Sequence, residues 1–521
     1  MTASAPSASG KPDMKLFWAC FIALVATSFV FGIRATLMGD IADALKLTDE
    51  QKGVIFGVGL WPFAISIILF SFIVDRIGYK TVAAFAIVCH VVSIALTVTA
   101  TGYQALYWGT FLISIANGMV ECFINPVVAT VFSKQKAKWL NILHAGWPAG
   151  MVLGALTNIA LRGHMDWHVI YGMCAVPVVV YTILLLPQKF PVNERVAAGV
   201  SFRDMLKEVG AVGFFIFGAL VAAGITQLIR ISSTTEALET AESSLAFLKL
   251  AGCVGLVAGV LGGLYTRSLG NGLFLVVLLT MGPLATTELG TDSWMNDLLE
   301  GDLGKWAAWV FVMVSIIMTI LRFFAGPIVH RFSPIGLLVV SAATASIGLL
   351  LLSSVPVSLI VVVAVLYAIG KTFLWSTTLG MVSEQFPRGG ALTLNGVSAV
   401  GVLGLGIFGS PLMGWFQDRN IDTELRTQHP AIYAKVQAPS KYTLFGEDPV
   451  RNEAMVKALP KEEKDQLDAI VTHEKRMVFA RQAVLPAFML LCYLGIFAYF
   501  KLRGGYRPVE LGHAEEAEPG F

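Results

Sequence analysis

Four ionisable side chains interrupt apolar stretches that are long enough to cross a lipid bilayer. They are Arg34, Glu121, Glu288 and Lys371. An ionisable group at the centre of a membrane costs about 2.5–3.5 kcal/mol on insertion scales, so such a group usually faces a cavity or a partner. Each of the four lies in a different apolar stretch, and together they predict a polar site enclosed by several membrane helices.

Glu121 lies in the middle of a polar stripe. Asn117, Glu121 and Asn125 are spaced at i, i+4 and i+8, which places them on one face of a helix. This stripe is suited to binding a polyhydroxylated solute or a proton. Arg34 allows two interpretations of the glutamate. In the first, Arg34 moves toward or away from Glu121 during transport and so changes whether Glu121 binds a proton. In the second, Arg34 and Glu121 form a permanent structural ion pair.

Six side chains in two apolar stretches, one of which is the stretch that carries Lys371, combine aromatic, amide, imidazole, ammonium and hydroxyl groups. They are Asn141, His144, Trp147, Lys371, Trp375 and Thr378. Aromatic rings stack on the apolar faces of sugars while polar neighbours bind the hydroxyl groups, so these residues are candidate solute contacts. The alternative for each tryptophan and for His144 is an ordinary contact between packed helices.

The composition defines the elements that must position these groups. The 521 residues are 56% hydrophobic and 14% charged, and 50 are glycine, unlike a soluble globular domain. A membrane helix needs about 20 apolar residues, and fourteen such spans are predicted. They lie at about 16–38, 53–74, 82–102, 105–132, 141–161, 167–187, 210–229, 247–266, 271–292, 306–330, 335–353, 358–382, 391–415 and 481–500. The 37 basic and 35 acidic residues give no indication of a nucleic-acid partner.

Basic short loops orient the chain. RIGYK, SKQKAKW and the loop that follows the sixth span carry the positive charge that is typical of cytoplasmic loops. Both termini are therefore predicted to be cytoplasmic, in a plasma membrane or bacterial inner membrane. The predicted segments are a cytoplasmic tail 1–15, a six-helix half 16–187, a cytoplasmic linker 188–209, an inserted helix pair 210–266, a second six-helix half 267–500 with a long loop 417–480, and a cytoplasmic tail 501–521.

The two six-helix halves share local patterns. SFIVDRIGYK, which begins at Ser71, has a counterpart in GPIVHRFSPI, which begins at Gly326. LNILHAG and LNGVSAV each open a helix after a cytoplasmic loop. These similarities predict two pseudo-symmetric halves with the helix pair inserted between them.

SFIVDRIGYK resembles the loop motif of the major facilitator superfamily, which is usually Gly-x-x-x-Asp-Arg-x-Gly-Arg/Tyr-Lys. Asp75, Arg76, Gly78 and Lys80 match this motif, and Ser71 replaces its first glycine. The resemblance implies an all-α polytopic membrane protein in which the two halves rock about a midplane site. It also implies that main helices one, four, seven and ten line that site.

A second resemblance concerns the fucose:proton symporter branch of that superfamily. Glu121, Asn125 and Pro126 match its Glu-x-x-x-Asn-Pro pattern, and LATTELGTDSW, which begins at Leu284, resembles its seventh helix. Members of that branch carry a second acidic residue in the first helix, where this chain has Arg34.

These observations predict a secondary active transporter that takes up a sugar or polyol together with protons, with Glu121 as the proton-binding group. One alternative is a transporter or exchanger of a small organic anion held by Arg34 and Lys371. Another is a membrane receptor that binds without transport. No enzyme motif, cofactor or metal centre is expected, because HMDWH has no further ligand nearby.

Charged residues at the cytoplasmic helix ends are expected to control the change between conformations, through ion pairs and helix dipoles. The predicted gating residues are Asp75, Arg76, Gly78, Lys80, Arg331 and Glu384. Arg322 is also buried, and we expect it to belong to the scaffold.

Overall fold

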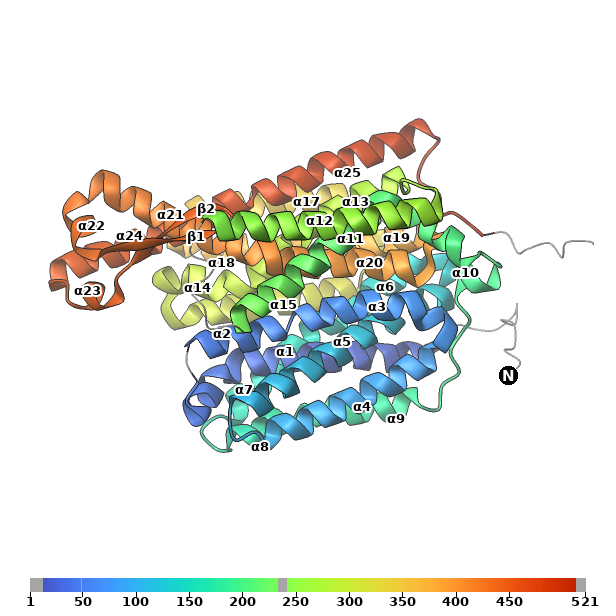
Figure 1. The fold of residues 1–521 in the computed structure, drawn as a ribbon, viewed down its shortest axis with the longest axis horizontal. Helices are drawn as coiled ribbons and strands as arrows, with labels where there is room; N and C mark the ends of the chain where they lie inside the picture. Colours follow the sequence, from blue (N-terminus) through green and yellow to red (C-terminus); the bar gives the residue numbers. More distant parts are fainter. Residues whose placement is uncertain (1–12, 48, 233–240, 512–521) are drawn as a thin grey trace, which may run out of the picture.

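The computed structural model describes residues 13–47, 49–232 and 241–511 as a helical bundle that carries a small module at one end (Figure 1). The predicted tails 1–15 and 501–521, and the loop between the two inserted helices, lie partly outside the described residues. Helix α1 (Met14–Leu45) begins, and helix α25 (Val484–Leu502) ends, at the same end of the bundle (Figure 1). We call this the terminal end and the opposite one the module end.

The first half of the chain is held together by close contact between α1 and α7. Its elements are α1, α2 (Asp49–Val58), α3 (Trp61–Ile77), α4 (Tyr79–Val98), α5 (Tyr103–Val131), η1 (Ser133–Gln135), α6 (Lys136–His144), α7 (Gly146–Leu161), α8 (Trp167–Gly172) and α9 (Ala175–Leu185). Gly146, Gly150 and Gly154 recur every four residues along α7. A side chain at Gly150 would collide with the Ser28 hydroxyl and the Val25 carbonyl of α1. The glycines therefore allow the two backbones to touch.

The second half packs around α17, which contacts α18, α19 and α25. Its elements are α13 (Gly272–Ala285), η2 (Thr286–Gly290), α14 (Thr291–Leu303), η3 (Gly304–Trp306), α15 (Ala307–Phe323), α16 (Gly326–Arg331), α17 (Pro334–Ser354), η4 (Val357–Leu359), α18 (Ile360–Lys371), α19 (Leu374–Gln385), η5 (Pro387–Gly389), α20 (Gly390–Gly404), η6 (Leu405–Gly409), α21 (Ser410–Gln428), α24 (Lys461–Gln482) and α25. The two halves meet where α20 packs on α3 and α5, and where α19 packs on α6.

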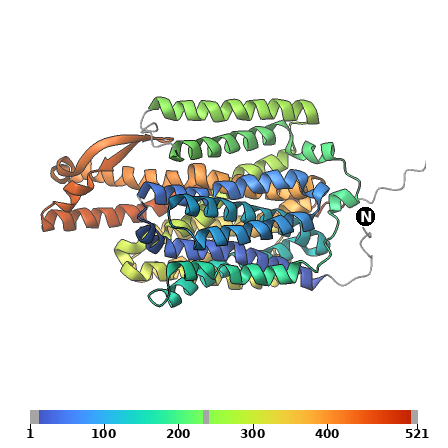
Figure 2. The ribbon, with the colours of Figure 1, turned by 60° about the horizontal axis from the view of Figure 1, so that its bottom comes forward.

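The inserted segment forms a helical hairpin on one side of the bundle (Figure 2). After the short helix α10 (Glu194–Ala197), α11 (Phe202–Ser232) packs on α12 (Ala241–Thr266) and also contacts α20. Gly210 has a φ of +56°, which a glycine adopts readily and which kinks α11. At the kink, the Ala211 N–H donates to the Ser268 carbonyl at 2.9 Å, so the hairpin is fastened to the chain that follows it.

The module lies between α21 and α24 and contains α22 (Pro430–Val436), strands β1 (Gln437–Thr443) and β2 (Gly446–Arg451), and α23 (Glu453–Lys457). The strands are antiparallel, with Gln437 opposite Arg451. A separate small apolar core holds the module together. It consists of Ile421, Leu425, Ile432, Val436 and Leu467. The predicted long loop 417–480 is thus a folded unit, and its β-hairpin was not predicted.

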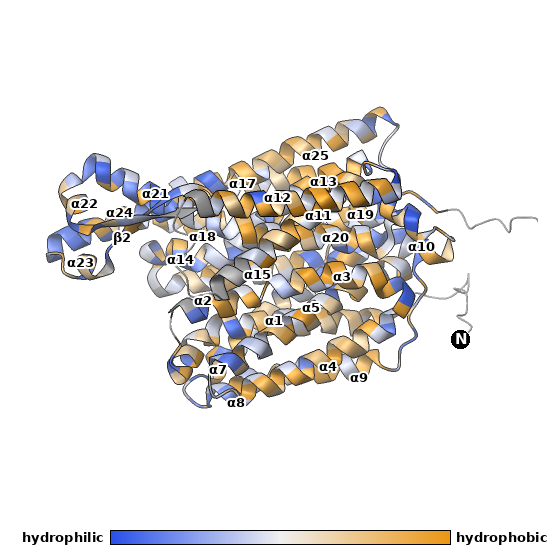
Figure 3. Ribbon diagram, viewed as in Figure 1, coloured by the Kyte–Doolittle hydropathy of each residue, from blue (hydrophilic) through white to orange (hydrophobic). Residues whose placement is uncertain are grey.

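The membrane-spanning helices agree with the predicted all-α polytopic fold. In the described part of the chain, 12 helices are long and apolar enough to cross a membrane, and Ala307–Phe323 is a shorter apolar helix. Apolar residues run along the bundle, whereas hydrophilic residues gather at its ends and over the module (Figure 3). Several spans predicted as continuous helices are interrupted. Three of these interruptions shape the centre of the bundle: 141–161 breaks at Ala145, 271–292 contains the π-helical η2, and 358–382 breaks between α18 and α19.

Candidate functional site

The polar stripe of α5 lies where the two halves meet. Glu121 is buried, and the Asn125 side-chain amide donates to Glu121 Oε2 at 2.7 Å. Pro126 has no N–H, so the Cys122 carbonyl lacks its usual helical donor. The side-chain amide of Asn395, on α20, donates to that carbonyl at 2.8 Å. The proline within α5 therefore makes possible a hydrogen bond between the halves.

The break between α6 and α7 extends this network. His144 ends α6, and its Nε2 lies 2.9 Å from Asn125 Oδ1. Because the amide nitrogen of Asn125 donates to Glu121, the imidazole must donate to the amide oxygen. Pro148 leaves the His144 carbonyl without a helical donor, and Arg322 Nη1 donates to it at 3.2 Å. Thus His144 links the α5 stripe to the second half.

Arg322 and Glu288 form an ion pair in which each side chain is only 1% exposed, with Nη2 and Oε1 2.5 Å apart. The guanidinium Nε donates to the Thr372 carbonyl at 2.6 Å, in the gap between α18 and α19. The Trp375 N–H, in the first turn of α19, donates to Glu288 Oε2 at 3.1 Å. Both the unpaired N–H and the helix dipole favour a carboxylate there. The π-helical η2 brings Glu288 to this position.

A second ion pair lies beside the first. Lys371 is fully buried and is paired with Asp292. Its Nζ also lies 3.4 Å from the Glu288 carbonyl and 5.4 Å from the centre of the Tyr367 ring. Glu288 and Asp292 are therefore both paired with cations from neighbouring helices.

Glu121 differs from these two carboxylates. Among the described residues, no cation pairs with it, and its side chain accepts a hydrogen bond from the neutral Asn125 amide. Burying an ionised carboxylate with only a neutral donor is costly, whereas burying a carboxyl group that carries a proton is not. The geometry around Glu121 therefore suits a proton-binding group.

These groups surround a closed central cavity of about 20 Å³, which has room for about one water molecule. Its wall consists of Phe63, Glu121, His144, Trp147, Glu288, Leu289, Arg322, Trp375 and Val402. The buried Trp147 Nε1 has no hydrogen-bond acceptor within the described ranges. Val402 also lines an adjacent pocket of about 90 Å³ that reaches α2. The cavity must widen before a solute larger than water can enter.

The terminal end is closed by contacts between α6 and the end of α19. Lys136 Nζ lies 2.5 Å from Glu194 Oε2 and donates to the Ser383 carbonyl at 3.2 Å. The Ala137 N–H donates to Glu384 Oε1 at 3.2 Å. The bonds to Ser383 and Glu384 join the two halves directly.

The last turn of α3 and the glycine that follows it add further contacts at the terminal end. Asp75 pairs with Arg195 of α10, with Oδ2 2.6 Å from Nη2 and 3.0 Å from Nε. The Arg76 guanidinium lies 4.9 Å from the centre of the Phe202 ring, at the start of α11. Gly78 has a φ of +84°, and this conformation lets the chain turn sharply from α3 into α4. The linker that follows the first half is therefore bound to the end of α3.

Comparison with known proteins identifies the family of this bundle. The family model described as Major Facilitator Superfamily matches residues 20–299, which is more than half of the chain. This chain belongs to the major facilitator superfamily. Over 185 residues it is 24% identical to a TsgA homolog of Buchnera aphidicola and 22% identical to the niacin transporter NiaP of Acinetobacter baylyi. The match covers 35% of this chain and 48% and 42% of those relatives, so the facilitator spans about half the length of each.

Solved structures share the fold of this facilitator. The fucose:proton symporter FucP of E. coli has a TM-score of 0.56 and 13% identity, with 92% of this chain and 99% of that chain covered. The human organic anion transporter MFSD10 has a TM-score of 0.56 and 13% identity, with 93% and 100% covered. The proton:xylose symporter XylE has a TM-score of 0.58 and 12% identity, with 91% and 95% covered. NiaP, MFSD10 and the two symporters are named as transporters, and the family match also points to a transporter and not an enzyme.

The structure brings five of the predicted residues to the cavity of this facilitator. They are Glu121, His144, Trp147, Glu288 and Trp375. It adds Arg322, which lies in the cavity wall and whose ion pair and bonds to carbonyl groups are compatible with the expected scaffold role. Asp292, the partner of Lys371, was also missed, although it lies four residues after Glu288.

Three predicted solute contacts are bonded to the protein outside the cavity wall. Asn117 Oδ1 lies 2.9 Å from His90 Nε2. Asn141 accepts from the Ser376 hydroxyl at 2.6 Å, across the contact between α6 and α19. The Thr378 hydroxyl donates to a carbonyl of its own helix at 2.8 Å. In this arrangement these side chains support the helices that carry the cavity.

Arg34 lies apart from Glu121. It is 6% exposed, with its guanidinium 5.0 Å from the centre of the Phe31 ring and against Gly59. Neither the switchable contact nor the structural ion pair between Arg34 and Glu121 is present among the described side chains. The clamp formed by Arg34 and Lys371 is not assembled either, because Lys371 is held by its carboxylate partner.

The predicted gating residues separate into two groups. Asp75, Arg76, Gly78 and Glu384 lie at the contacts that close the terminal end. Lys80 and Arg331 are exposed there. Arg195, the partner of Asp75, lies on the short helix α10, and the sequence around it gives no indication of that contact. In the described part of the chain, no three His, Cys, Asp or Glu side chains form a metal site.

The chain after α25 folds back onto the closed terminal end. The Tyr506 hydroxyl donates to Glu384 Oε2 at 2.8 Å, and the Val509 N–H donates to the Glu384 carbonyl at 2.8 Å. Gln385 donates to the Arg507 carbonyl at 2.8 Å. Burial raises the pKa of Tyr506 well above its usual value, so its phenol remains a neutral donor at physiological pH. This segment therefore holds Glu384 in the position where its carboxylate accepts the hydrogen bond from the Ala137 N–H.

Replacing Tyr506 by phenylalanine is expected to weaken this closure. Loss of one hydrogen bond to a charged acceptor, worth about 1.5–3 kcal/mol, should increase the labelling rate of Ser383→Cys by a maleimide at least about tenfold. The rate is measured in a background without accessible native cysteines. Tyr499→Phe, a matched change on exposed α25 surface, should leave the rate unchanged. Equal labelling rates in the two variants would show that the segment does not hold the terminal end closed.

Proposed function

We propose that this facilitator is a symporter that takes up a sugar or polyol together with a proton by alternating access. The observation that carries the proposal is Glu121. This buried carboxyl group has no cation partner among the described side chains, and it adjoins a cavity formed by both halves of the chain. A group in that environment can bind and release a proton as the halves move.

The walls of the cavity suit a polyhydroxylated solute. Trp147 and Trp375 offer aromatic faces, while His144 and Glu288 offer polar groups. The Trp147 N–H, which has no acceptor among the described residues, would gain one from a solute hydroxyl. Two proteins with the same fold are named as proton symporters of fucose and xylose, and this agrees with the proposal.

The contacts between the halves suggest how the proton and the solute are coupled. The terminal end, which the basic loops favour as cytoplasmic, can open only if α6 separates from α19. Separation also stretches the bond from Arg322 to the His144 carbonyl, and His144 is bonded to Asn125 beside Glu121. Opening would therefore disturb the groups that hold the Glu121 proton, so release of proton and solute would occur on the same side.

Transport by purified protein in liposomes tests the proposal. The liposomes carry an inward proton gradient and are exposed to neutral sugars, polyols and small organic anions. Wild type should accumulate a neutral sugar or polyol and acidify the lumen, and Glu121→Gln should do neither. Glu300→Gln, a matched change on an exposed face of α14, should behave as wild type. Accumulation of anions alone would favour the anion transporter, and binding without flux would favour a receptor.

A further inference from the structure

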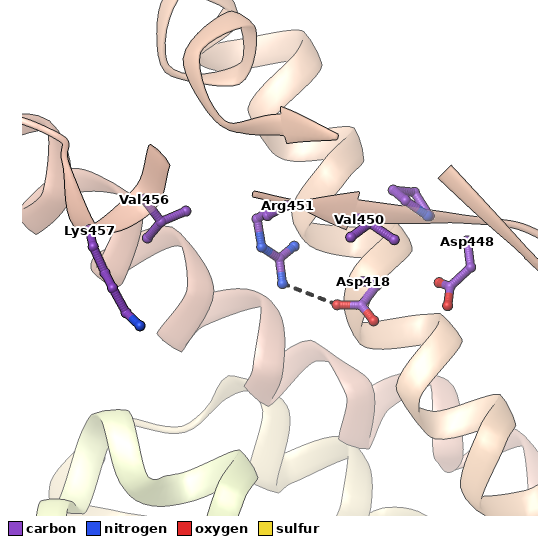
Figure 4. Close-up of a pocket in the computed structure, with 7 residues that line it drawn as sticks. Asp418, Asp448, Val450, Arg451, Val456 and Lys457 are labelled. Atoms are coloured by element: carbon purple, nitrogen blue, oxygen red, sulfur yellow. Dashed lines mark hydrogen bonds and ion pairs between the residues drawn. The ribbon is translucent and has the colours of Figure 1, made fainter. Parts of the chain in front are cut away.

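A small pocket of about 90 Å³ adjoins the central cavity. Its walls come from α2 and the first residue of α3, from the inserted helix α11, and from α20 with η6. Val402 lines both this pocket and the central cavity, so the two spaces meet at its side chain. The larger pocket of the module, in contrast, shares no lining residue with the central cavity, and its Arg451 is paired with Asp418 at 3.1 Å (Figure 4).

The side chains that line the small pocket are apolar apart from one N–H group. They belong to valine, leucine, isoleucine and tryptophan residues, and glycines form the rest of the wall. The Nε1 of Trp61 is buried and has no hydrogen-bond acceptor among the described residues. A buried donor without an acceptor costs free energy, and a ligand oxygen would remove that cost. The lining therefore favours a small apolar group that carries an acceptor.

The inserted hairpin supplies one wall of this pocket through Gly224 of α11. A methyl group at Gly224 would lie 3.4 Å from Leu403 Cδ2, an ordinary contact, whereas a longer side chain would enter the pocket. The same helix packs tightly on α20, because a methyl group at Gly396 would lie 2.8 Å from the Phe217 ring. The insertion therefore completes a pocket whose other walls belong to the two halves.

The size and the lining of the pocket define the group that fits it. A space of about 90 Å³ holds a group of a few non-hydrogen atoms. A hydroxyl group would leave the aliphatic wall without an apolar contact, and an alkyl group would leave the Trp61 N–H without an acceptor. A charged group would find no opposite charge among the described lining residues. An acetyl group provides both a methyl group and a carbonyl oxygen.

The neighbouring cavity indicates what carries the acetyl group. This step rests on the proposed uptake of a sugar, whose ring would occupy the central cavity once it has widened. A substituent of that ring would pass Val402 to reach the small pocket. We propose that the solute is an acetamido sugar. Its acetyl carbonyl accepts from the Trp61 N–H, and its methyl group lies against the aliphatic wall.

Uptake by purified protein in liposomes with an inward proton gradient tests this. The probes are matched pairs: D-glucose and N-acetyl-D-glucosamine, D-galactose and N-acetyl-D-galactosamine, and D-mannose and N-acetyl-D-mannosamine. At least one acetamido sugar should have a half-saturating concentration at least about tenfold below that of its parent, because it satisfies a buried donor and buries a methyl group. Equal half-saturating concentrations within every pair would overturn the proposal.

Matched variants locate the acetyl group. Trp61→Phe keeps an aromatic ring and removes the N–H, and Gly224→Leu occupies the pocket. Each should reduce the preference to within about threefold while uptake of the parent sugar is retained, which shows that the variant folds. Trp309→Phe, on an exposed face of α15, and Gly252→Leu, where the space around an added carbon is open, should keep the full preference. A preference that survives both pocket variants would reject the site.

Failure of this inference differs from failure of the proposed function. Uptake of a parent sugar or a polyol without any of the acetamido sugars would reject the acetyl pocket and leave the symporter in place. No uptake of any neutral sugar or polyol would reject both.

Discussion

Replacing Arg322 by methionine is expected to lower the free energy of unfolding by about 3–5 kcal/mol. The substitution leaves Glu288 buried without its cation and removes the donors to two carbonyl groups at breaks in membrane helices. Glu288→Gln should also destabilise, because it leaves the guanidinium buried without its anion. The measurement is the unfolding midpoint of the purified protein in mild detergent.

A double-variant cycle tests whether the loss of stability comes from breaking the ion pair between Arg322 and Glu288 or from a general disturbance of packing in the core. Arg322→Met combined with Glu288→Gln should be less destabilised than the sum of the single variants, because neither charge is then left unpaired. Arg76→Met is the control, since Arg76 is exposed and contacts the ring of Phe202. Additive losses would show that the two side chains act separately.

Glu121→Gln is expected to abolish accumulation driven by a proton gradient while it preserves exchange. A gradient of one pH unit supplies about 1.4 kcal/mol per proton, enough for tenfold accumulation of a solute carried with one proton. Glutamine resembles a protonated glutamate in shape, so the halves should still exchange positions, but no proton is carried. The accumulation ratio should fall from about ten to about one.

Solute counterflow is the measurement that separates coupling from transport. Liposomes loaded with unlabelled solute should take up labelled solute through Glu121→Gln, at a rate that does not depend on pH. Loss of counterflow together with accumulation would indicate that Glu121 is needed for binding or for the movement itself. A glutamine variant that still accumulates solute would remove Glu121 from the coupling mechanism.

The helical bundle could be predicted because short, continuous stretches of the sequence are enough to identify its helices and its family. Apolar runs of about 20 residues define membrane helices, and the Asp75 to Lys80 motif indicates the family. The interruptions at Ala145, within η2 and between α18 and α19 were missed because each lies inside a run that is apolar enough to span. The periodicity of apolar residues does not reveal a π-helical turn such as η2, which contains one residue more than an α-helical turn. That extra residue nevertheless sets the direction in which the Glu288 side chain points.

The contacts across the centre could be predicted only in part. Pro126 and Pro148 can be recognised from the sequence as residues that leave a carbonyl group without its helical donor. The donors that satisfy those carbonyls, Asn395 and Arg322, lie 273 and 178 residues away along the chain. Their positions depend on how the two halves pack, which one sequence without its fold does not specify.

The way the module is attached also matters for imaging. It joins the bundle through two helices, α21 and α24, and ion pairs from Lys475 to Asp297 and from Arg476 to Asp302 fix it against α14. Membrane proteins with little mass outside the lipid are hard to align in cryo-electron microscopy. A rigid fusion partner placed between α21 and α24 would share the orientation of the bundle, and particle images could then be aligned on it while the central cavity is left unchanged.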